Sequence, residues 1–185
     1  MSITDQQAHQ VLENAECCYT KAQIETAIDQ MAAAITADLG GKNPLLLCVM
    51  TGGLIITGDL LLRLDFPLQY DYIHATRYAG KTRGSTLSWV SKPHIPLKGR
   101  HVLIVDDILD EGITLKELIA YCEQEQVASA RTAVLVSKQH ERKYMDTADY
   151  VGLTVEDRYV FGYGMDYKGY LRNVPGIYAV NEKET

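Results

Sequence analysis

The sequence predicts an α/β fold with a mostly parallel central sheet flanked by helices. Two continuous apolar runs, Leu45–Met50 and Val102–Val105, lack the polar alternation of strands that have one solvated face. Both suit strands that are covered on both faces. Each run leads through a short glycine-containing loop into a segment with apolar residues at helical spacing. This repeated order of strand, loop and helix is typical of parallel sheets.

The first 40 residues predict two helices with a structural role. Thr4 with Gln7, and Thr20 with Gln23, have the spacing of a capping box. The second pair opens an apolar stripe with helical spacing, formed by Ile24, Ala27, Ile28, Met31, Ile35 and Leu39.

Thr51, Gly52 and Gly53 follow the first buried run and precede a helical segment. Two glycines at the end of a strand are compatible with a simple close turn. They also let an anion approach the backbone N–H groups, because no side chain stands in the way. Together with the acidic turn described below, this loop is a candidate pyrophosphate site.

The next segment predicts a hairpin. Leu68–Ala75 has the character of a strand, residues 76–84 are polar and basic, and residues 86–90, which include Trp89, indicate the returning arm. The composition of the connection is also that of an ordinary exposed loop.

Asp106 and Asp107 directly follow the second buried run. A strand covered on both faces has no room for charge, so we expect these residues to mark its carboxyl end. Open α/β sheets place their ligand crevices there. Asp110, Glu111 and Gly112 then form a tight acidic turn before a helix.

This turn suits a phosphorylated sugar. The helix N-terminus offers unpaired N–H groups, Gly112 allows close approach of a phosphate, and Thr114 adds a hydroxyl. The acids would repel a bare phosphate, but they suit sugar hydroxyls and a bound Mg2+ near Asp106 and Asp107, with the reacting carbon near Asp110. The alternative is that acids at a helix start merely complement the helix dipole.

Lys138 follows a further buried strand, predicted over Arg131–Val136. A lysine beyond a strand is commonly a solvated charge. If it faces a ligand, it selects a carbonyl group over an amino group, because lysine has donors and no acceptor. Further along, Tyr159, Phe161 and Tyr163 alternate, a pattern compatible with a strand that has one aromatic face.

Composition narrows the class of partner. A net charge of -6 and a pI of about 5.3 argue against a nucleic-acid surface. The four cysteines show neither a metal spacing nor a disulfide framework, which favours a reduced, cytoplasmic location, and the five histidines show no ligand spacing. No apolar run approaches the roughly 20 residues of a membrane span, and the polar N-terminus does not indicate a signal peptide. The expected partners are small molecules.

The acidic turn resembles the signature of the type I phosphoribosyltransferases, and matched segments run in order from Leu45 to Val180. The similarity extends to bacterial hypoxanthine-guanine phosphoribosyltransferases. It implies that the turn binds phosphoribosyl pyrophosphate (PRPP). It also implies a Rossmann-like single domain over residues 1–185, with a small hood from residues 1–40 and 157–185 and a flexible hairpin flap at about 76–91. A homodimer or homotetramer is implied as well.

The resemblance gives each matched residue a role. It implies that Asp110 is catalytic and accepts the proton from purine N7, and that Arg77 and Tyr78 belong to the flap. The residues implied to bind PRPP and its phosphates are Asp106, Asp107, Glu111, Gly112, Ile113, Thr114, Thr51, Gly52 and Arg172. Those implied to serve the purine are Lys138, Tyr159 as the stacking ring, Val160 through its backbone, and Asp166. Mg2+ would be held by Asp106, Asp107 and Asp166.

Three positions depart from the family pattern. Many relatives have lysine where Thr51 stands, the flap carries Arg77 in place of serine, and Glu111 must point its carboxylate away from a phosphate. The resemblance also implies a cis peptide between Met50 and Thr51.

The implied reaction is purine salvage, in which hypoxanthine or guanine and PRPP give IMP or GMP and pyrophosphate. Three alternatives stay open from the sequence. One is a xanthine-preferring enzyme of the same kind. Another is a non-catalytic regulator with the same fold, and the third is a receiver-type signalling domain, which also places an acidic pair after a buried strand.

Overall fold

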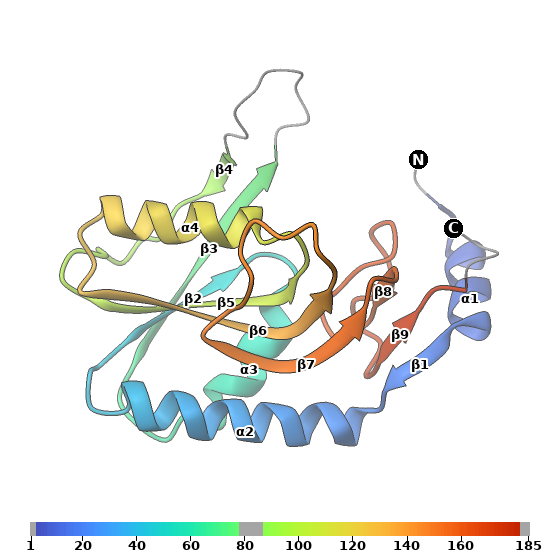
Figure 1. Cartoon of the computed structure of the whole chain (residues 1–185), viewed down its shortest axis with the longest axis horizontal. Coiled ribbons are helices and arrows are strands. Elements are labelled where there is room, and N and C mark those ends of the chain that lie inside the picture. The colour runs from blue at the N-terminus through green and yellow to red at the C-terminus, as the bar shows by residue number, and fades with distance from the viewer. Residues whose placement is uncertain (1–2, 78–86, 182–185) are drawn as a thin grey trace.

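The structure, a computed structural model, describes residues 3–77 and 87–181, apart from the side chains of residues 77 and 87. Its centre is a six-stranded sheet (Figure 1). The strands are β2 (Leu45–Val49), β3 (Gln69–Arg77), β4 (Leu87–Ser91), β5 (His101–Leu109), β6 (Ser129–Gln139) and β7 (Tyr150–Glu156). Their order is β4-β3-β2-β5-β6-β7, and only the β3–β4 pair is antiparallel. The predicted fold class is confirmed.

Helices cover both faces of this sheet, as the continuous apolar runs predicted. In β2, Leu45 and Leu47 pack towards α4 (Ile113–Gln124), whereas Leu46 packs towards α2 (Lys21–Leu39) and α3 (Leu54–Leu61). All five residues of β2 are buried. A strand between two helical layers needs apolar side chains on both faces, which explains the absence of alternation.

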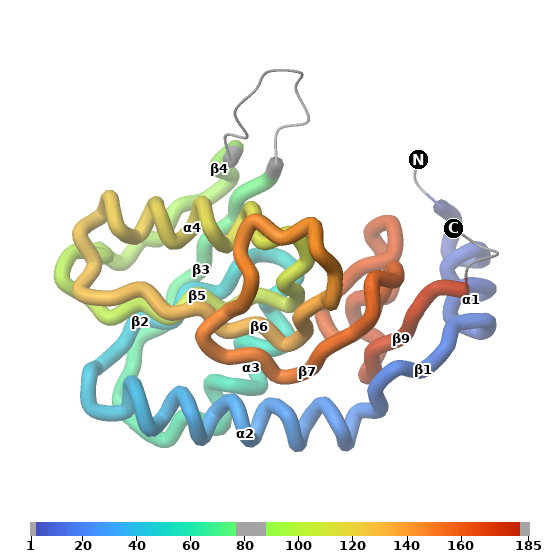
Figure 2. The backbone as a smooth tube through the Cα atoms, viewed as in Figure 1, coloured from blue at the N-terminus to red at the C-terminus, as the bar shows by residue number. Residues whose placement is uncertain are grey.

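A smaller antiparallel sheet lies beside the large one. Its order is β1-β9-β8, from β1 (Glu16–Tyr19), β9 (Ile177–Ala179) and β8 (Val160–Phe161). Helix α1 (Asp5–Asn14) packs on it, so segments from the two ends of the chain lie side by side (Figure 2). In this small core Val11 contacts the cluster that holds Phe161, Tyr167 and Val180.

Both capping boxes predicted for the N-terminal helices are present, at Thr4 and at Thr20. The two helices belong to different layers, however. The expected hood included α2, but the apolar stripe of α2 packs instead against the large sheet, where Ile28 and Ile35 share a core with Leu103. The large sheet offers a broad apolar face that buries the stripe, so α2 packs there even though it follows α1 closely in the sequence.

Within the described ranges, no helix combines the length and apolar character needed to cross a lipid bilayer.

Candidate functional site

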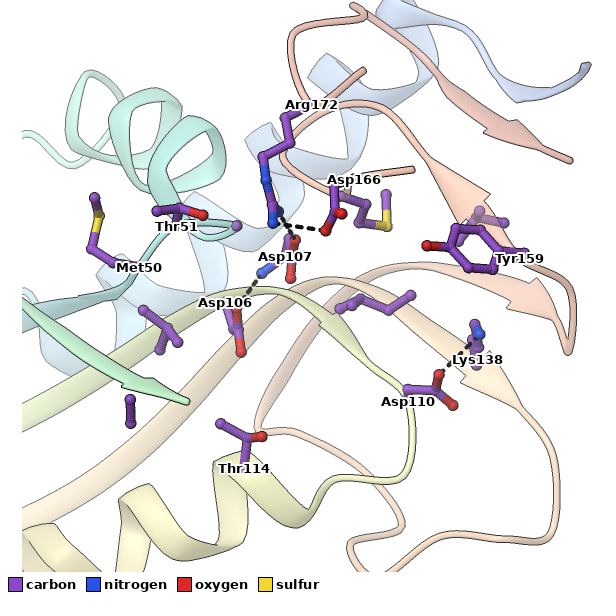
Figure 3. Close-up of a pocket in the computed structure, with 16 residues that line it drawn as sticks. Met50, Thr51, Asp106, Asp107, Asp110, Thr114, Lys138, Tyr159, Asp166 and Arg172 are labelled. Atoms are coloured by element: carbon purple, nitrogen blue, oxygen red, sulfur yellow. Dashed lines mark hydrogen bonds and ion pairs between the residues drawn. The ribbon is translucent and has the colours of Figure 1, made fainter. Parts of the chain in front are cut away.

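A cleft of about 420 Å³ opens at the carboxyl ends of β2, β5 and β6. This is the edge at which parallel sheets hold their ligands. The cleft gathers most of the predicted site residues from both halves of the chain (Figure 3). Those that line it are Thr51, Gly52, Asp106, Asp107, Asp110, Thr114, Lys138, Tyr159, Val160, Asp166 and Arg172.

The other predicted residues lie beside the cleft or outside the described part. Glu111 and Gly112 line an adjoining hollow, which shares Asp110 and Thr114 with the cleft. Ile113 is the first residue of α4. Most of the predicted flap, with Tyr78, lies outside the described residues, and so does the side chain of Arg77.

The acidic pair lies within a strand and does not mark its end. β5 continues past Asp106 and Asp107 to Leu109, and its pairing with β6 runs on through Ile108 and Leu109. The expectation that β5 stops at Asp106 is wrong. The strand tolerates both acids because they line the cleft, while the backbone keeps its hydrogen bonds to the neighbouring strand.

Burial dominates the electrostatics of this pair. It raises the pKa of Asp106 well above the ordinary value, and the neighbouring charge of Asp107 raises it further. Burial also raises the pKa of Asp107, although Asp106 and Arg172 act in the opposite direction. The Asp107 N–H donates to Asp106 Oδ1 at 2.9 Å. Two adjacent buried carboxyls ionise together only when positive charge is supplied.

Arg172 supplies part of that positive charge. Its guanidinium lies 2.7 Å from Asp166 Oδ1 and 3.8 Å from Asp107 Oδ2, and it also donates to the carbonyl of Gly164. The second oxygen of Asp166 accepts from the N–H of Gly169 at 2.7 Å. Arg172 therefore ties the C-terminal segment to β5.

The turn after β5 has the form of an anion cradle. Gly112 precedes α4 with a left-handed φ of 82°, and its side-chain-free Cα packs closely under Met145. A Cβ on Gly112 would lie 2.7 Å from the Cβ of Met145. The backbone of the turn is anchored from the same segment, because the Tyr144 N–H donates to the Glu111 carbonyl at 2.7 Å. Helix α4 begins directly after this glycine, and backbone N–H groups at a helix start favour anions.

A second glycine loop stands across the cleft. The Met50–Thr51 peptide is cis, as the resemblance implied. Gly52 packs directly against the Asp107 carboxylate, in the place where a Cβ would overlap it. A side chain at this position would displace the Asp107 carboxylate, so Gly52 lets this loop lie directly against the acidic pair.

Asp110 is held by two side chains from β6 and the residue after it. Lys138 Nζ lies 2.9 Å from Asp110 Oδ2, and His140 Nε2 lies 2.7 Å from Asp110 Oδ1. Burial raises the pKa of Asp110, but the hydrogen bonds from Lys138 and His140 outweigh it and hold that pKa below its ordinary value. Sequence reasoning missed His140, since its partner is 30 residues away and no spacing connects them.

Tyr159 and Val160 line the cleft together with Lys138. Tyr159 is 43% exposed, and its ring meets the ring of Tyr167 edge to face at a centroid distance of 5.4 Å. The predicted aromatic alternation does not form one strand face, because β8 contains only Val160 and Phe161. Phe161 is fully buried, and Tyr159 alone of these rings lines the cleft.

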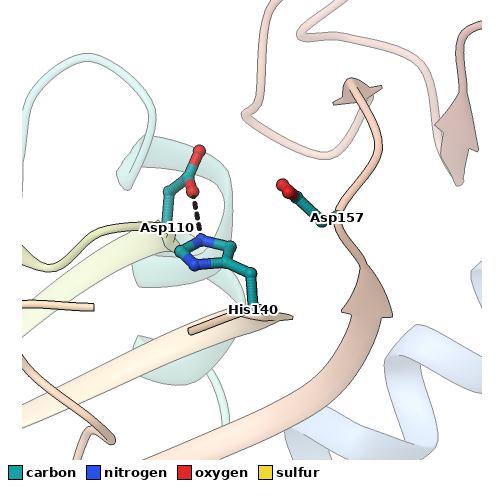
Figure 4. A group of neighbouring side chains, drawn as sticks. All are labelled: Asp110, His140 and Asp157. Atoms are coloured by element: carbon teal, nitrogen blue, oxygen red, sulfur yellow. Dashed lines mark hydrogen bonds and ion pairs between the residues drawn. The ribbon is translucent and has the colours of Figure 1, made fainter. Parts of the chain in front are cut away.

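Asp110 and His140 also lie near Asp157 (Figure 4). Among the described residues, these three form a group whose ligand atoms lie within 4.8 Å of one another, a geometry that could hold a metal ion. Their polar atoms already have partners, since Asp157 pairs with Arg142 at 2.8 Å and Asp110 with Lys138. The group therefore belongs to a hydrogen-bonded network in which Arg142 links Asp157 to His140. Three separate segments supply it, which the spacing of the histidines could not reveal.

Comparison with known proteins gives one family. The sequence profile of the phosphoribosyl transferase domain matches residues 18–168. A hypoxanthine-guanine-xanthine phosphoribosyltransferase of Tritrichomonas foetus is 36% identical over 165 residues, covering 89% of this chain and 90% of the relative. A hypoxanthine-guanine phosphoribosyltransferase of Streptococcus pneumoniae is 34% identical, covering 87% of this chain and 90% of that protein.

Solved structures agree with the sequence comparison. A hypoxanthine phosphoribosyltransferase from Staphylococcus aureus superposes with a TM-score of 0.87 at 29% identity, covering 98% of both chains. A variant of the enzyme from Trypanosoma cruzi, in a ternary complex with substrates, superposes with a TM-score of 0.87 at 32% identity, covering 93% of this chain and 98% of that one.

Proposed function

Since the chain belongs to the phosphoribosyltransferase family, we infer that it is a 6-oxopurine phosphoribosyltransferase of purine salvage. It joins hypoxanthine or guanine to the ribose of PRPP and releases pyrophosphate. The names of its relatives support this activity. Neither the regulator nor the receiver domain considered from the sequence has comparable support.

One observation carries the assignment of this activity to the cleft. The acidic pair borders both the cleft that Tyr159 lines and the adjoining hollow that the turn at Gly112 lines, so the anion cradle and the aromatic ring flank the same two carboxylates. We propose that the 5′-phosphate of PRPP binds the backbone from Glu111 to Thr114. Backbone N–H groups at a helix start hold phosphate without a fixed positive side chain, and Glu111 then keeps its carboxylate away from the anion.

The pyrophosphate group is proposed to bind the loop at Thr51 and Gly52, with Arg172 beside it. Because Thr51 replaces the lysine of many relatives, positive charge at this end comes chiefly from Arg172, which now pairs with Asp166. Binding of pyrophosphate would then compete with that ion pair. The ribose hydroxyls are placed by the same proposal between the loops, next to Asp106 and Asp107.

The purine is proposed to lie between Tyr159 and Lys138. Tyr159 offers an exposed ring face on which a base stacks, and the backbone of Val160 reads the edge of the base. Lys138 donates to the 6-oxo group. The move of Lys138 to the purine releases one oxygen of Asp110, which accepts the proton from N7 as general base.

The residues present fit Mg2+, which we propose as the cofactor. Asp106 and Asp107 supply oxygen ligands, and their raised pKa values mark a place where a cation is favourable. Asp166 is the third proposed ligand, although it is paired with Arg172 in the structure. Mg2+ commonly uses one or two carboxylates together with substrate phosphates, so a tight cage of three is not required. When bound, it would neutralise charge on the leaving pyrophosphate.

Three further expectations remain proposals. The small sheet with α1 is proposed as the hood of a single domain, and residues 76–91, with Arg77 and Tyr78, as a flap that excludes water from the reacting carbon. A homodimer or homotetramer is consistent with the exposed apolar side chains of Leu54, Tyr70 and Tyr72 around a hollow on one face. A cytoplasmic location is consistent with four cysteines that are free thiols.

Pyrophosphate release from PRPP in the presence of Mg2+ tests the proposed function. The bases to compare are hypoxanthine, guanine, xanthine, adenine and uracil. We expect release with hypoxanthine and guanine and none with adenine or uracil. Xanthine belongs in the panel because the name of the Tritrichomonas foetus relative includes it. Pyrophosphate release only with adenine or uracil, or no release with any base, would contradict the assignment.

A further inference from the structure

We propose that His140 is a positioning residue that holds the Asp110 carboxylate in its reactive orientation while Lys138 binds the purine. The proposal rests on the proposed function, in which Asp110 is the general base. His140 donates to one oxygen of the Asp110 carboxylate and Lys138 donates to the other. When the Lys138 ammonium group moves to the purine, the hydrogen bond from His140 is the remaining side-chain contact with Asp110 that the structure shows.

The hydrogen bonds of the imidazole define its tautomer. The backbone N–H of Arg142 donates to His140 Nδ1 at 3.1 Å, so this nitrogen acts as an acceptor and carries no proton. The proton of the neutral ring must then be on Nε2, which faces Asp110 Oδ1 at 2.7 Å. His140 therefore acts as a fixed neutral donor to the carboxylate. A second proton on Nδ1 would face the Arg142 N–H.

The imidazole is itself fixed in place. The His140 side chain is only 5% exposed. The segment that follows it contacts the acidic turn at successive positions. Tyr144 bonds to the carbonyl of Glu111, and Met145 packs on Gly112. Residues 140–145 thus contact residues 110–112 at several positions, and within this segment His140 is the residue that bonds to the proposed base, Asp110.

Charged groups from several elements surround Asp110 and His140. Lys138 on β6, Glu111 in the acidic turn, Arg142 in the β6–β7 connection and Asp157 after β7 all lie near them. In the proposed reaction, the positively charged Lys138 leaves Asp110 to bind the purine. The neutral donor His140 then keeps the Asp110 carboxylate oriented, and it lowers the basicity of Asp110 less than a second ammonium group would.

The test compares steady-state kinetics of the wild type with those of His140→Leu and His140→Gln, with hypoxanthine and PRPP as substrates and pH as the variable. Leucine fills the space without a donor, whereas the amide of glutamine can replace the Nε2–H. We expect His140→Leu to lower kcat by about 10- to 100-fold, with the KM for PRPP nearly unchanged. We expect His140→Gln to keep most of the wild-type kcat.

The pH profile separates positioning from a general structural role. The hydrogen bond from His140 lowers the pKa of Asp110, so its loss raises that pKa. The acidic limb of the kcat profile should therefore move to higher pH in His140→Leu and stay in place in His140→Gln. His101→Leu is the matched control, because His101 bonds Ser129 at the opposite ends of the same two strands.

Each outcome is decisive. A wild type that is inactive with every base contradicts the proposed function itself. An active wild type contradicts the role of His140 if His140→Leu has wild-type kcat and pH profile, if the Gln and Leu variants fail equally, or if His101→Leu fails as much. If the Leu variant does not fold, His140→Asn replaces it. Asparagine is polar but too short to reach Asp110, so it should lose activity that glutamine retains.

Discussion

Asp110, the proposed general base, has both of its carboxylate oxygens engaged by other side chains in the structure. Lys138 and His140 hold the pKa of Asp110 low, so the carboxylate is ionised and pre-aligned but weakly basic. In the proposed reaction, the 6-oxo group of the purine takes Lys138 from Asp110, which would raise the pKa of Asp110. Under this proposal, binding of the correct purine increases the basicity of the group that deprotonates it.

The first prediction follows for Asp110→Asn. Asparagine keeps the size of the side chain but cannot accept the N7 proton, so kcat for hypoxanthine should fall by about 10² to 10⁴, with the KM for PRPP little changed. Asp157→Asn is the control, since Asp157 lies nearby but pairs with Arg142. Steady-state kinetics check both variants, and wild-type turnover in Asp110→Asn would remove this residue from the mechanism.

The second prediction concerns Lys138→Ala. Loss of a charged donor to the 6-oxo group should cost about 1.5 to 3 kcal/mol, which appears as a rise of about 10- to 100-fold in the KM for hypoxanthine. The KM for PRPP should stay near its wild-type value. Lys143→Ala serves as the control, because Lys143 bonds Ser137 and the Asp146 carbonyl. Purine kinetics that are equal in the two variants would refute the role of Lys138.

The third prediction concerns stability at Asp106. The folded protein holds a proton on this carboxyl over a pH range in which the unfolded chain, with a pKa near 3.8, has lost it. Wild-type stability therefore falls as pH rises from that value through the raised folded pKa. Asp106→Asn removes this charge and should stabilise the substrate-free protein at neutral pH by about 1 kcal/mol or more, or about 2 to 4 °C in Tm per kcal/mol.

Thermal unfolding over a range of pH measures this effect. The gain from Asp106→Asn should vanish at acidic pH, where wild-type Asp106 is protonated, and the exposed Asp65→Asn should show no such trend. A variant that is less stable than the wild type at neutral pH would show that the Asp106 charge is well compensated in the absence of ligand.

Residue chemistry in the sequence predicted the acids and the lysine of the cleft, because they follow buried parallel strands at the edge where ligands bind. The role of Tyr159 came only from the family resemblance, since the aromatic alternation alone was compatible with an ordinary strand face. Sequence reasoning missed His140 for a physical reason. An imidazole becomes informative only through its partner, and the contact between His140 and Asp110 depends on how the segment after β6 folds back over the acidic turn.

At the scale of the element, the turn into α4 matters most. Gly112 has a left-handed φ of 82°, which favours glycine, and it lies so close under Met145 that there is no space for a Cβ. Both features shape the N–H groups proposed to bind the 5′-phosphate. A side chain here must disturb the turn, Met145 or both.

The fourth prediction is that Gly112→Ala raises the KM for PRPP by about 10-fold or more and lowers stability by about 1 to 3 kcal/mol. Gly99→Ala is the matched control. Gly99 also has a positive φ, of 72°, but nothing lies within 4 Å of the position that a Cβ would take, so this variant should show only the backbone cost. Kinetics and thermal unfolding distinguish the two, and equal KM values for PRPP would contradict the anion cradle.

Element boundaries show where sequence reasoning reached its limit. Apolar runs predicted β2 and β5 correctly, since burial on both faces leaves a clear pattern. The extension of β5 through Asp106 to Leu109 was missed, because backbone pairing with β6 continues wherever side chains can turn into a cleft. The layer of α2 was missed as well, since an apolar stripe predicts that a helix is buried but does not say against which face.

At the scale of the whole molecule, the parallel sheet brings distant segments to one edge. The loops after β2, β5 and β6 meet there, and the segments that flank β8 contribute Tyr159 and Arg172 from the last third of the chain. Strand order places β5 between β2 and β6, so the acidic turn lies between the two other loops. The proposed ribose therefore sits between pyrophosphate on one side and purine on the other.

A crystal structure of the protein with IMP tests the central claim most directly. We predict that the phosphate of IMP lies within hydrogen-bond distance of the backbone N–H groups at the start of α4, that its purine stacks on Tyr159, and that Lys138 Nζ has moved from Asp110 to the 6-oxo group. IMP bound elsewhere, or bound in the cleft with its base away from Lys138, would contradict the account.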